Sequence, residues 1–280
     1  MNSDFAAPTL AEKWSNVQTI LREMGSVVVG YSGGVDSALL ARVGHDILGE
    51  KCIAVLALSE SLPQREQIQA VEFAHAENIR LETVDARELD NEAYASNPTD
   101  RCYYCKHELF THLFAVALNH GISWIAYGAN HDDLSDIRPG HRAADEFHVR
   151  APLLEAGMTK AEIRHVSRKL SLTTWDKPAM ACLSSRFPHG TRITAELLNR
   201  LDQAEDFLRH DLGLRQVRVR HHDAIARVEV GESEFDMLLD VVMRQRISTK
   251  LKSLGYTFVA LELEPYQSGS LNKMSTMTED

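Results

Sequence analysis

The sequence predicts an α/β protein in which a parallel-sheet, Rossmann-like domain is followed by a small α+β domain. From residue 26 to about 175, short apolar runs alternate with helical stretches, a pattern typical of βαβ units and of a parallel sheet with helices on both faces. After about residue 191 the order becomes helix, two strands, helix and strand. We therefore expect a first domain at 1–190, a second at 191–266, and a polar, disordered tail at 267–280.

Hydrophobic periodicity predicts the individual elements. Apolar runs rich in β-branched residues indicate strands in the first domain at 26–31, 52–58, 80–85 and 122–127. Amphipathic stretches between them indicate helices at 37–48, 63–77 and 102–119. In the second domain we expect a helix at 195–209, strands at 216–221 and 226–230, a helix at 233–253 and a strand at 256–263.

The composition narrows the class of protein. With 44% hydrophobic and 25% charged residues among 280, the chain is typical of a globular enzyme. Its formal net charge of −10 argues against nucleic acid as the main partner, because such a partner requires a basic face. The first ten residues lack the features of a signal peptide, and no apolar run approaches the ~20 residues that span a bilayer. We expect a cytoplasmic protein without a membrane partner.

A glycine-rich loop follows the first expected strand and precedes a helix. It reads Ser32-Gly33-Gly34-Val35-Asp36-Ser37. Adjacent glycines let backbone N–H groups approach a phosphate, and the helix start adds the positive end of its dipole. Ser32 and Ser37 offer hydroxyl donors, and Asp36 is our choice for a Mg²⁺ ligand. The loop lacks the Lys of a Walker P-loop, and it resembles the SGGxDS signature of PP-loop ATP pyrophosphatases, which grip the β–γ pyrophosphate of ATP. The alternative is an ordinary glycine turn.

Cysteines mark a second candidate site. Cys102 and Cys105 are three residues apart at the start of an expected helix, with Asp100 as its N-cap, so both thiols share one helical face. A helix start favours the thiolate, the form that attacks or binds metal. Cys182 lies in a stretch without clear periodicity, which we expect to be a loop over the strand ends. Cys52 falls within an apolar run and is expected in the core.

Three cysteines leave alternatives open. A structural zinc site requires a fourth ligand, which His107 or His189 would supply. A [4Fe–4S] cluster held by Cys102, Cys105 and Cys182 would leave one iron open for exogenous sulfide. The third alternative is that these cysteines bind no metal.

Several blocks of the sequence together resemble one family, the LarE-type ATP-dependent sulfur transferases, and the likeness spans about residues 15–265. The blocks are YSGGVDS at 31–37, NPTDRCYYCK at 97–106, YGANHDDLSDIRPG at 127–140, WDKPAMACLSSR at 175–186 and QVRVRHHDAIARVEV at 216–230. That family makes the nickel-pincer nucleotide cofactor used by lactate racemase.

The resemblance implies a reaction. ATP adenylates a carboxylate of pyridinium-3,5-dicarboxylate mononucleotide with release of pyrophosphate, and sulfur then replaces AMP to leave a thiocarboxylate. In some members a single cysteine, matching Cys182, gives up its own sulfur. Members with an additional CxxC are thought to use a [4Fe–4S] cluster that relays sulfide from a donor. The three-cysteine pattern here indicates the second type, in which Cys102, Cys105 and Cys182 are catalytic.

The resemblance also suggests roles for charged residues. Within the block at 127–140, Asn130 and Asp133 are expected to contact ATP. Asp132 and Asp133 are candidates to join the Mg²⁺ or contact the nucleotide, and the alternative for both is helix capping or solvation. Cationic side chains suited to the substrate's carboxylates or phosphate are Arg138, Lys177 and Arg186.

Arg218 and Arg220 are two apart on an expected strand, so their side chains point to one face, and such a pair suits a phosphate. They match family positions linked to anion binding at a subunit contact. The alternative is a solvated sheet face with Glu229 as cross-strand partner. Family members form trimers and hexamers, so we expect a homo-oligomer.

Three other functions remain open at this stage. A PP-loop tRNA thiolase also adenylates and can carry three cysteines, although the acidic composition argues against it. An amidating enzyme of the NAD-synthetase kind would use ammonia and leave the cysteines idle. An ATP-binding module with a structural metal site would bind nucleotide without turnover.

Overall fold

The computed structural model describes residues 8–135, 139–178 and 181–267, and the chain divides into two compact units. The first unit takes Met1–Ser59, Glu66–Ala86 and Cys102–Met180. The second takes Glu60–Arg65, Arg87–Arg101 and Ala181–Asp280. The longest segment of the second unit therefore begins about ten residues before the boundary expected at 190. The unit also includes two earlier segments of the chain.

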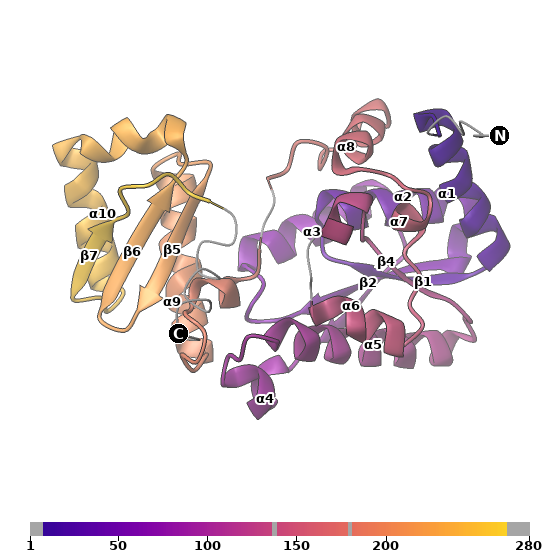
Figure 1. Cartoon of the computed structure of the whole chain (residues 1–280), viewed down its shortest axis with the longest axis horizontal. Coiled ribbons are helices and arrows are strands. Elements are labelled where there is room, and N and C mark those ends of the chain that lie inside the picture. The colour runs from indigo at the N-terminus through magenta and orange to yellow at the C-terminus, as the bar shows by residue number, and fades with distance from the viewer. Residues whose placement is uncertain (1–7, 136–138, 179–180, 268–280) are drawn as a thin grey trace, which may run out of the picture. The chain divides into compact units, whose positions relative to one another are not determined.

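The first unit contains a four-stranded parallel sheet in the order β3-β2-β1-β4 (Figure 1). Its strands are β1 Val27–Tyr31, β2 Cys52–Leu58, β3 Leu81–Asp85 and β4 Ile125–Tyr127. Because β1 is central and its aliphatic residues are fully buried, it reads as the continuous apolar run that a doubly covered parallel strand requires. The carboxyl ends of β1 and β4 lie side by side, since Gly30 pairs with Tyr127.

Helices cover both faces of this sheet (Figure 1). They are α1 Leu10–Met24, α2 Val35–Leu48, α3 Gln64–Ala76, α5 Arg101–His120, α6 Pro139–Glu146, α7 Pro152–Glu155 and α8 Lys160–Lys169. On one face Phe110 and Leu113 of α5 pack against Val28, Ile53 and Val55. Burial of such aliphatic and aromatic side chains stabilises the unit by about 1.5–3 kcal/mol for each side chain.

The second unit is a three-stranded sheet packed on helices. Its strands are β5 Val217–His222, β6 Ile225–Val230 and β7 Phe258–Leu261, and its α-helices are α4 Glu92–Ala95, α9 Ala195–Asp206 and α10 Val241–Ser253. β5 and β6 are antiparallel neighbours, whereas β6 and β7 are parallel. One core joins Leu198 and Leu201 of α9 to Val217 and Val219 of β5.

The predicted fold class is confirmed: a parallel α/β sheet with helices is followed by a small second sheet. Some elements differ from the expectation. The helix expected at 233–253 is broken at Asp240, which caps α10 by accepting a hydrogen bond from the Met243 N–H, and 232–239 forms a 3-10 helix instead. The strand expected at 122–127 is only three residues long. Helices α1, α4, α6, α7 and α8 were not predicted.

Within the described ranges, every helix is too short or too polar to cross a membrane. Residues 268–280, most of the tail expected to be disordered, lie outside the described residues.

Candidate active site

The glycine-rich loop joins β1 to α2 with a conformation that its sequence requires. Gly33 has φ +70°, and a Cβ there would lie 2.7 Å from the Cβ of Ala70, so both its backbone and its surroundings demand glycine. The loop is closed by hydroxyl contacts: the Ser32 N–H donates to Ser37 Oγ at 3.1 Å, and Ser37 Oγ donates to the Gly34 carbonyl at 3.2 Å. The N–H groups at the start of α2 are thereby presented as an anion site.

A second glycine brings the end of β4 against this loop. A Cβ on Gly128 would lie 2.7 Å from the backbone nitrogen of Ser37, a contact that real Cβ atoms do not make. Gly128 therefore allows the segment after β4 to touch the first turn of α2. Asn130, only 4% exposed, reaches across this contact, and its Nδ2 is 3.5 Å from Asp36 Oδ2.

Asp36 lies in the first turn of α2, and the two oxygens of its carboxylate differ in their contacts. Its Oδ2 is 2.6 Å from Lys160 Nζ. Its Oδ1 is buried and finds no hydrogen-bond partner among the residues that the structure describes. A buried carboxylate oxygen with free lone pairs fits a hard cation, and Mg²⁺ needs only one or two carboxylates beside phosphates and waters. Asp36 is thus a suitable magnesium ligand.

The two aspartates after Asn130 take part in holding the loop. Asp132 Oδ2 accepts a 2.9 Å hydrogen bond from the Lys160 N–H, and Asp133 Oδ2 accepts one of 3.0 Å from the Asn130 N–H. The capping alternative for Asp132 therefore has direct support, because Lys160 is the first residue of α8.

Lys177 reaches the glycine-rich loop. Its Nζ donates to the Gly33 carbonyl at 3.2 Å and is 2.5 Å from Glu66 Oε2. Arg164 of α8 fixes the segment that carries Lys177, because its guanidinium donates to the carbonyls of Trp175 and Lys177 at 2.9 and 2.8 Å. Two lysines, Lys160 and Lys177, thus bring positive charge to the loop.

The cysteines lie in different surroundings. Cys102 and Cys105 belong to the first unit on the first turns of α5; Cys102 is exposed and Cys105 half-buried. Cys182 belongs to the second unit, is half-buried, and precedes the 3-10 helix Leu183–Arg186. Cys52 is fully buried in β2, as expected, and burial raises the pKa of its thiol to about 12.

No group of three His, Cys, Asp or Glu side chains within the described ranges is close enough together to hold a metal ion. His107, a candidate fourth zinc ligand, packs its ring on Phe147 with the centroids 5.0 Å apart. His189, the other candidate, has a buried Nδ1 without a partner in the described part of the chain. Within the described part of each unit, therefore, these residues form no ready-made zinc or iron site.

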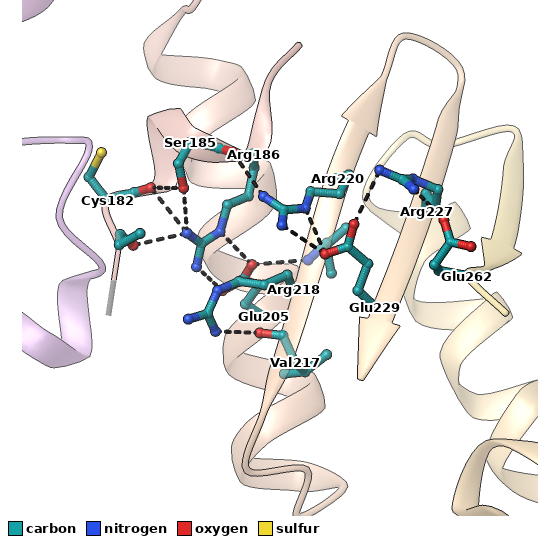
Figure 2. Close-up of polar contacts among 12 residues, drawn as sticks. Cys182, Ser185, Arg186, Glu205, Val217, Arg218, Arg220, Arg227, Glu229 and Glu262 are labelled. Carbon is teal, nitrogen blue, oxygen red and sulfur yellow. Dashed lines mark hydrogen bonds and ion pairs between the residues drawn. The ribbon is translucent and has the colours of Figure 1, made fainter. Parts of the chain in front are cut away.

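Buried ion pairs support the backbone that carries Cys182 (Figure 2). Arg186 is 0% exposed, and its Nε and Nη2 donate to the two carboxylate oxygens of Glu205 at 2.8 and 2.9 Å. The remaining Nη1 donates to the carbonyls of Ala181 and Cys182 at 2.9 and 3.1 Å, and to Ser185 Oγ. The Ser185 hydroxyl donates in turn to the Cys182 carbonyl at 2.8 Å.

Glu205 is the centre of this arrangement. Besides Arg186, its carboxylate accepts from Arg209 Nη2 at 2.8 Å and from the Val219 N–H at 3.0 Å, at the free edge of β5. Burial alone would raise the pKa of Glu205, but the charges of Arg186 and Arg209 outweigh it and lower that pKa to about 2. The interior of the second unit therefore keeps this carboxylate ionised.

Arg218 and Arg220 point to one face of β5, as predicted, but that face is buried rather than solvated (Figure 2). Arg220 donates through Nε and Nη2 to Glu229 Oε2 at 2.9 and 2.7 Å, and through Nη1 to the Ser185 carbonyl. Arg218 Nη1 donates to the Val217 carbonyl, and burial together with the charge of Arg186 lowers the pKa of Arg218 to about 10.

The structure thus brings some predicted residues together and assigns others to the interior. Asp36, Asn130 and Lys177 meet at the glycine-rich loop. Arg186, expected to face the substrate, is instead enclosed in an ion pair with Glu205, because no part of its side chain is exposed. Arg138 lies outside the described residues. Sequence reasoning missed Lys160 and Glu205, and neither belongs to a motif that marks its role.

The fold and this loop define a class. A parallel sheet whose first strand leads through an SGGxDS turn into a helix, with lysines beside the turn, is the ATP site of a PP-loop enzyme.

Comparisons with known proteins support this class and narrow it. The NAD synthase family model matches residues 12–102. A Synechocystis protein described as uncharacterised is 42% identical over 95% of this chain and 99% of its own length. The pyridinium-3,5-bisthiocarboxylic acid mononucleotide synthase of Lactiplantibacillus plantarum is 34% identical over 97% of this chain and 98% of its own length. An uncharacterised protein of Methanocaldococcus jannaschii is 28% identical over 86% of this chain and 91% of its own length.

The chain belongs to the LarE-type family of ATP-dependent sulfur transferases, within the PP-loop superfamily. It is an ATP-utilising enzyme, and the resemblance drawn from the sequence blocks is confirmed.

Proposed function

We propose that this enzyme adenylates a carboxylate of pyridinium-3,5-dicarboxylate mononucleotide and converts it to a thiocarboxylate for the nickel-pincer nucleotide. The named relative from Lactiplantibacillus plantarum makes the corresponding bisthiocarboxylic acid mononucleotide, and its sequence aligns with almost all of this chain. The observation that carries the proposal is the glycine-rich loop with Asp36 beside it, whose buried Oδ1 lacks a partner among the described residues.

The first half-reaction follows from that loop. A substrate carboxylate oxygen attacks the α-phosphorus of ATP, the α–β bridging bond breaks, and pyrophosphate leaves. Asp36 would hold a Mg²⁺, which would offset the charge of the leaving pyrophosphate. Backbone N–H groups at the start of α2, with Ser32, Gly33, Gly34 and Ser37, hold the β- and γ-phosphates. Asn130 and Asp133 contact the nucleotide from the loop after β4.

Sulfur transfer is the second half-reaction. A sulfide sulfur attacks the acyl carbon of the adenylate, AMP leaves with the carbon–oxygen bonding pair, and the thiocarboxylate forms. We assign Cys182, Cys102 and Cys105 to sulfur delivery. These three thiols would hold a [4Fe–4S] cluster, which would supply sulfide to successive adenylates. Support for this assignment comes from the CxxC spacing and from the solvent access of all three thiols, which are exposed or half-buried.

The remaining roles are proposed on charge and family likeness. Lys177 beside the loop suits the anionic substrate, and Arg138 remains a candidate from sequence alone. Arg218 and Arg220 are proposed to serve a phosphate at a subunit contact of a trimer or hexamer, although Arg220 already pairs with Glu229. A cytoplasmic enzyme that receives sulfide from a separate donor is consistent with these assignments.

Anaerobic mass spectrometry of the complete reaction tests the proposal. The mixture contains purified protein, Mg·ATP, the pyridinium dicarboxylate mononucleotide and sulfide. We expect AMP and thiocarboxylate in excess over protein, with the protein mass unchanged. Product limited to one equivalent, with the protein lighter by H₂S, would show that Cys182 is consumed and would overturn the relay. Absence of AMP would overturn the substrate assignment.

Two variants separate the half-reactions. Asp36→Ala should lower AMP formation by at least about a thousandfold, because Mg²⁺ loses its protein ligand. Cys182→Ala should form AMP at the native rate but no thiocarboxylate. Asp46→Ala is the control on the same helix, since Asp46 pairs only at the surface with Arg42. Thiocarboxylate formed at the native rate by Cys182→Ala would contradict the role of that cysteine.

A further inference from the structure

Lys160 occupies a fixed position between the glycine-rich loop and the loop after β4. It is the first residue of α8, and its N–H is held by Asp132 at 2.9 Å. Thr159 and Glu162 form a capping box around it, so the helix start is well determined. Its Nζ lies 2.6 Å from Asp36 Oδ2, while its side chain remains 32% exposed. The ammonium group is therefore anchored at Asp36 but still open to solvent.

A metal ion at Asp36 would share the charge of its carboxylate with Lys160. Lys160 uses Oδ2, and Oδ1 stays without a partner in the described part of the chain. A Mg²⁺ bound to this carboxylate would lie within a few ångströms of the ammonium, and two like charges at that separation repel each other. Bound magnesium would therefore weaken the attraction between Asp36 and the Lys160 ammonium.

We propose that Lys160 neutralises Asp36 in the nucleotide-free enzyme, and that Mg·ATP displaces its ammonium from Asp36 onto the departing pyrophosphate. The inference rests on the proposed function, because it assumes that ATP binds at this loop. A lysine suits the exchange, since its compact charge sits on a flexible four-carbon stem with three donors. Lys160 and Lys177 approach the loop from different segments of the chain. Lys177 already donates a hydrogen bond to the Gly33 carbonyl.

The exchange and a purely structural role of Lys160 predict opposite changes in how strongly nucleotide binding depends on magnesium when Lys160 is removed. With magnesium present, removing the ammonium loses one contact to phosphate. Without magnesium, the same change also leaves the Asp36 carboxylate uncompensated beside the polyphosphate. Loss of Lys160 should therefore weaken nucleotide binding in both conditions and weaken it more in the absence of metal. If Lys160 only oriented Asp36, its loss would instead reduce the benefit that magnesium gives.

The test is calorimetric binding of α,β-methylene-ATP, which cannot be cleaved at the reacting bond, to wild type and to Lys160→Met. Each protein is titrated with excess Mg²⁺ and again with EDTA. With Mg²⁺ we expect Kd to rise by about tenfold to a hundredfold, the range for losing a hydrogen bond to a charged group. The ratio of Kd in EDTA to Kd in Mg²⁺ should be larger in Lys160→Met than in wild type.

Lys169→Met is the matched control, because Lys169 lies on the same helix, is exposed, and is remote in sequence from the cap. It should leave both Kd values unchanged. An unchanged Kd in Lys160→Met, or a smaller metal ratio, would overturn the role of Lys160 while leaving the proposed function intact. Failure of the wild type itself to bind the analogue would instead refute the ATP site.

Discussion

The glycine-rich loop differs from the Arg186–Glu205 ion pair that supports Cys182, both in how far apart its residues lie in the sequence and in how its polar groups are used. The loop is built from residues close together in sequence, and one of its polar atoms, Asp36 Oδ1, is buried without a partner among the described residues. The support of Cys182 is built from residues 19 positions apart, and its charges are fully buried and mutually satisfied. The loop thus keeps a carboxylate oxygen available, whereas the Arg186–Glu205 pair uses both oxygens of its carboxylate within the protein.

This difference shows where charge can act on a substrate. Near the loop, Lys160 and Lys177 are 32% and 15% exposed, so their ammonium groups can be reassigned when an anion arrives. In the second unit, Arg186 has no exposed surface, and its guanidinium donates to Glu205, to the Ser185 hydroxyl and to the backbone of Ala181 and Cys182. Arg186 thus holds the backbone at Cys182 and has no exposed surface to offer a substrate.

The largest effect should come from Glu205→Gln, which breaks the buried pair and leaves Arg186 uncompensated. Removing one partner of a buried ion pair costs about 3–5 kcal/mol, and we expect the free energy of unfolding to fall by an amount in that range. The Cys182 backbone would lose its anchor at the same time, so thiocarboxylate formation should fall while AMP formation persists. Urea unfolding followed by circular dichroism, with an AMP assay, measures both.

Glu196→Gln provides the matched control, because Glu196 is on the same helix α9 but its side chain is 81% exposed and pairs with Arg200 at the surface. Such a pair contributes less than about 1 kcal/mol. Equal losses of stability in the two variants would show that burial of the Arg186–Glu205 pair does not matter.

Acid should weaken the same network over a defined range of pH. The folded-state pKa of Glu205 is about 2, below its ordinary value of 4.5, so folding favours the ionised form. The stability that this carboxylate contributes is therefore fully present above pH 4.5 and is lost as pH falls toward 2. A difference of this size corresponds to about 3 kcal/mol. The stability gap between wild type and Glu205→Gln should narrow across that range, and a constant gap would contradict the ion-pair account.

The sequence predicted the loop and missed the network for the same physical reason. A phosphate-binding turn is local, so its glycines, hydroxyls and aspartate appear side by side, and the strand and helix around it have clear periods. Glu205 lies within an ordinary amphipathic helix, and only the tertiary fold brings it against Arg186 and the edge of β5. An alternating strand such as β5 predicts one polar, solvated face, but here that face is buried by ion pairs.

Lys160 illustrates the same limit at the active site. Its sequence context, Thr159 followed by Glu162, indicates only a helix start. Its proximity to Asp36, 124 positions away, depends on the approach of the β4 loop to α2, which Gly128 permits.

The smallest effects on stability are expected from alanine substitutions of the two loop glycines, Gly33 and Gly34, which should differ from each other. Gly33 has φ +70° and no room for a Cβ, so Gly33→Ala should lower the free energy of unfolding by about 1–3 kcal/mol. Gly34 has φ −79° and ψ 165°, and a Cβ there would meet only Ser32 Oγ at 3.5 Å, an ordinary contact. Gly34→Ala should therefore change stability by less than about 0.5 kcal/mol.

If Gly34 is nevertheless needed, the reason must be the ligand. A methyl group at the N-cap of α2 would stand where a phosphate approaches the backbone, so Gly34→Ala should weaken binding of α,β-methylene-ATP while thermal unfolding stays at the native midpoint. Gly33→Ala should lower both. Native binding by Gly34→Ala would mean that the phosphates do not lie against this residue, and the pyrophosphate would then have to be held by the lysine side of the loop alone.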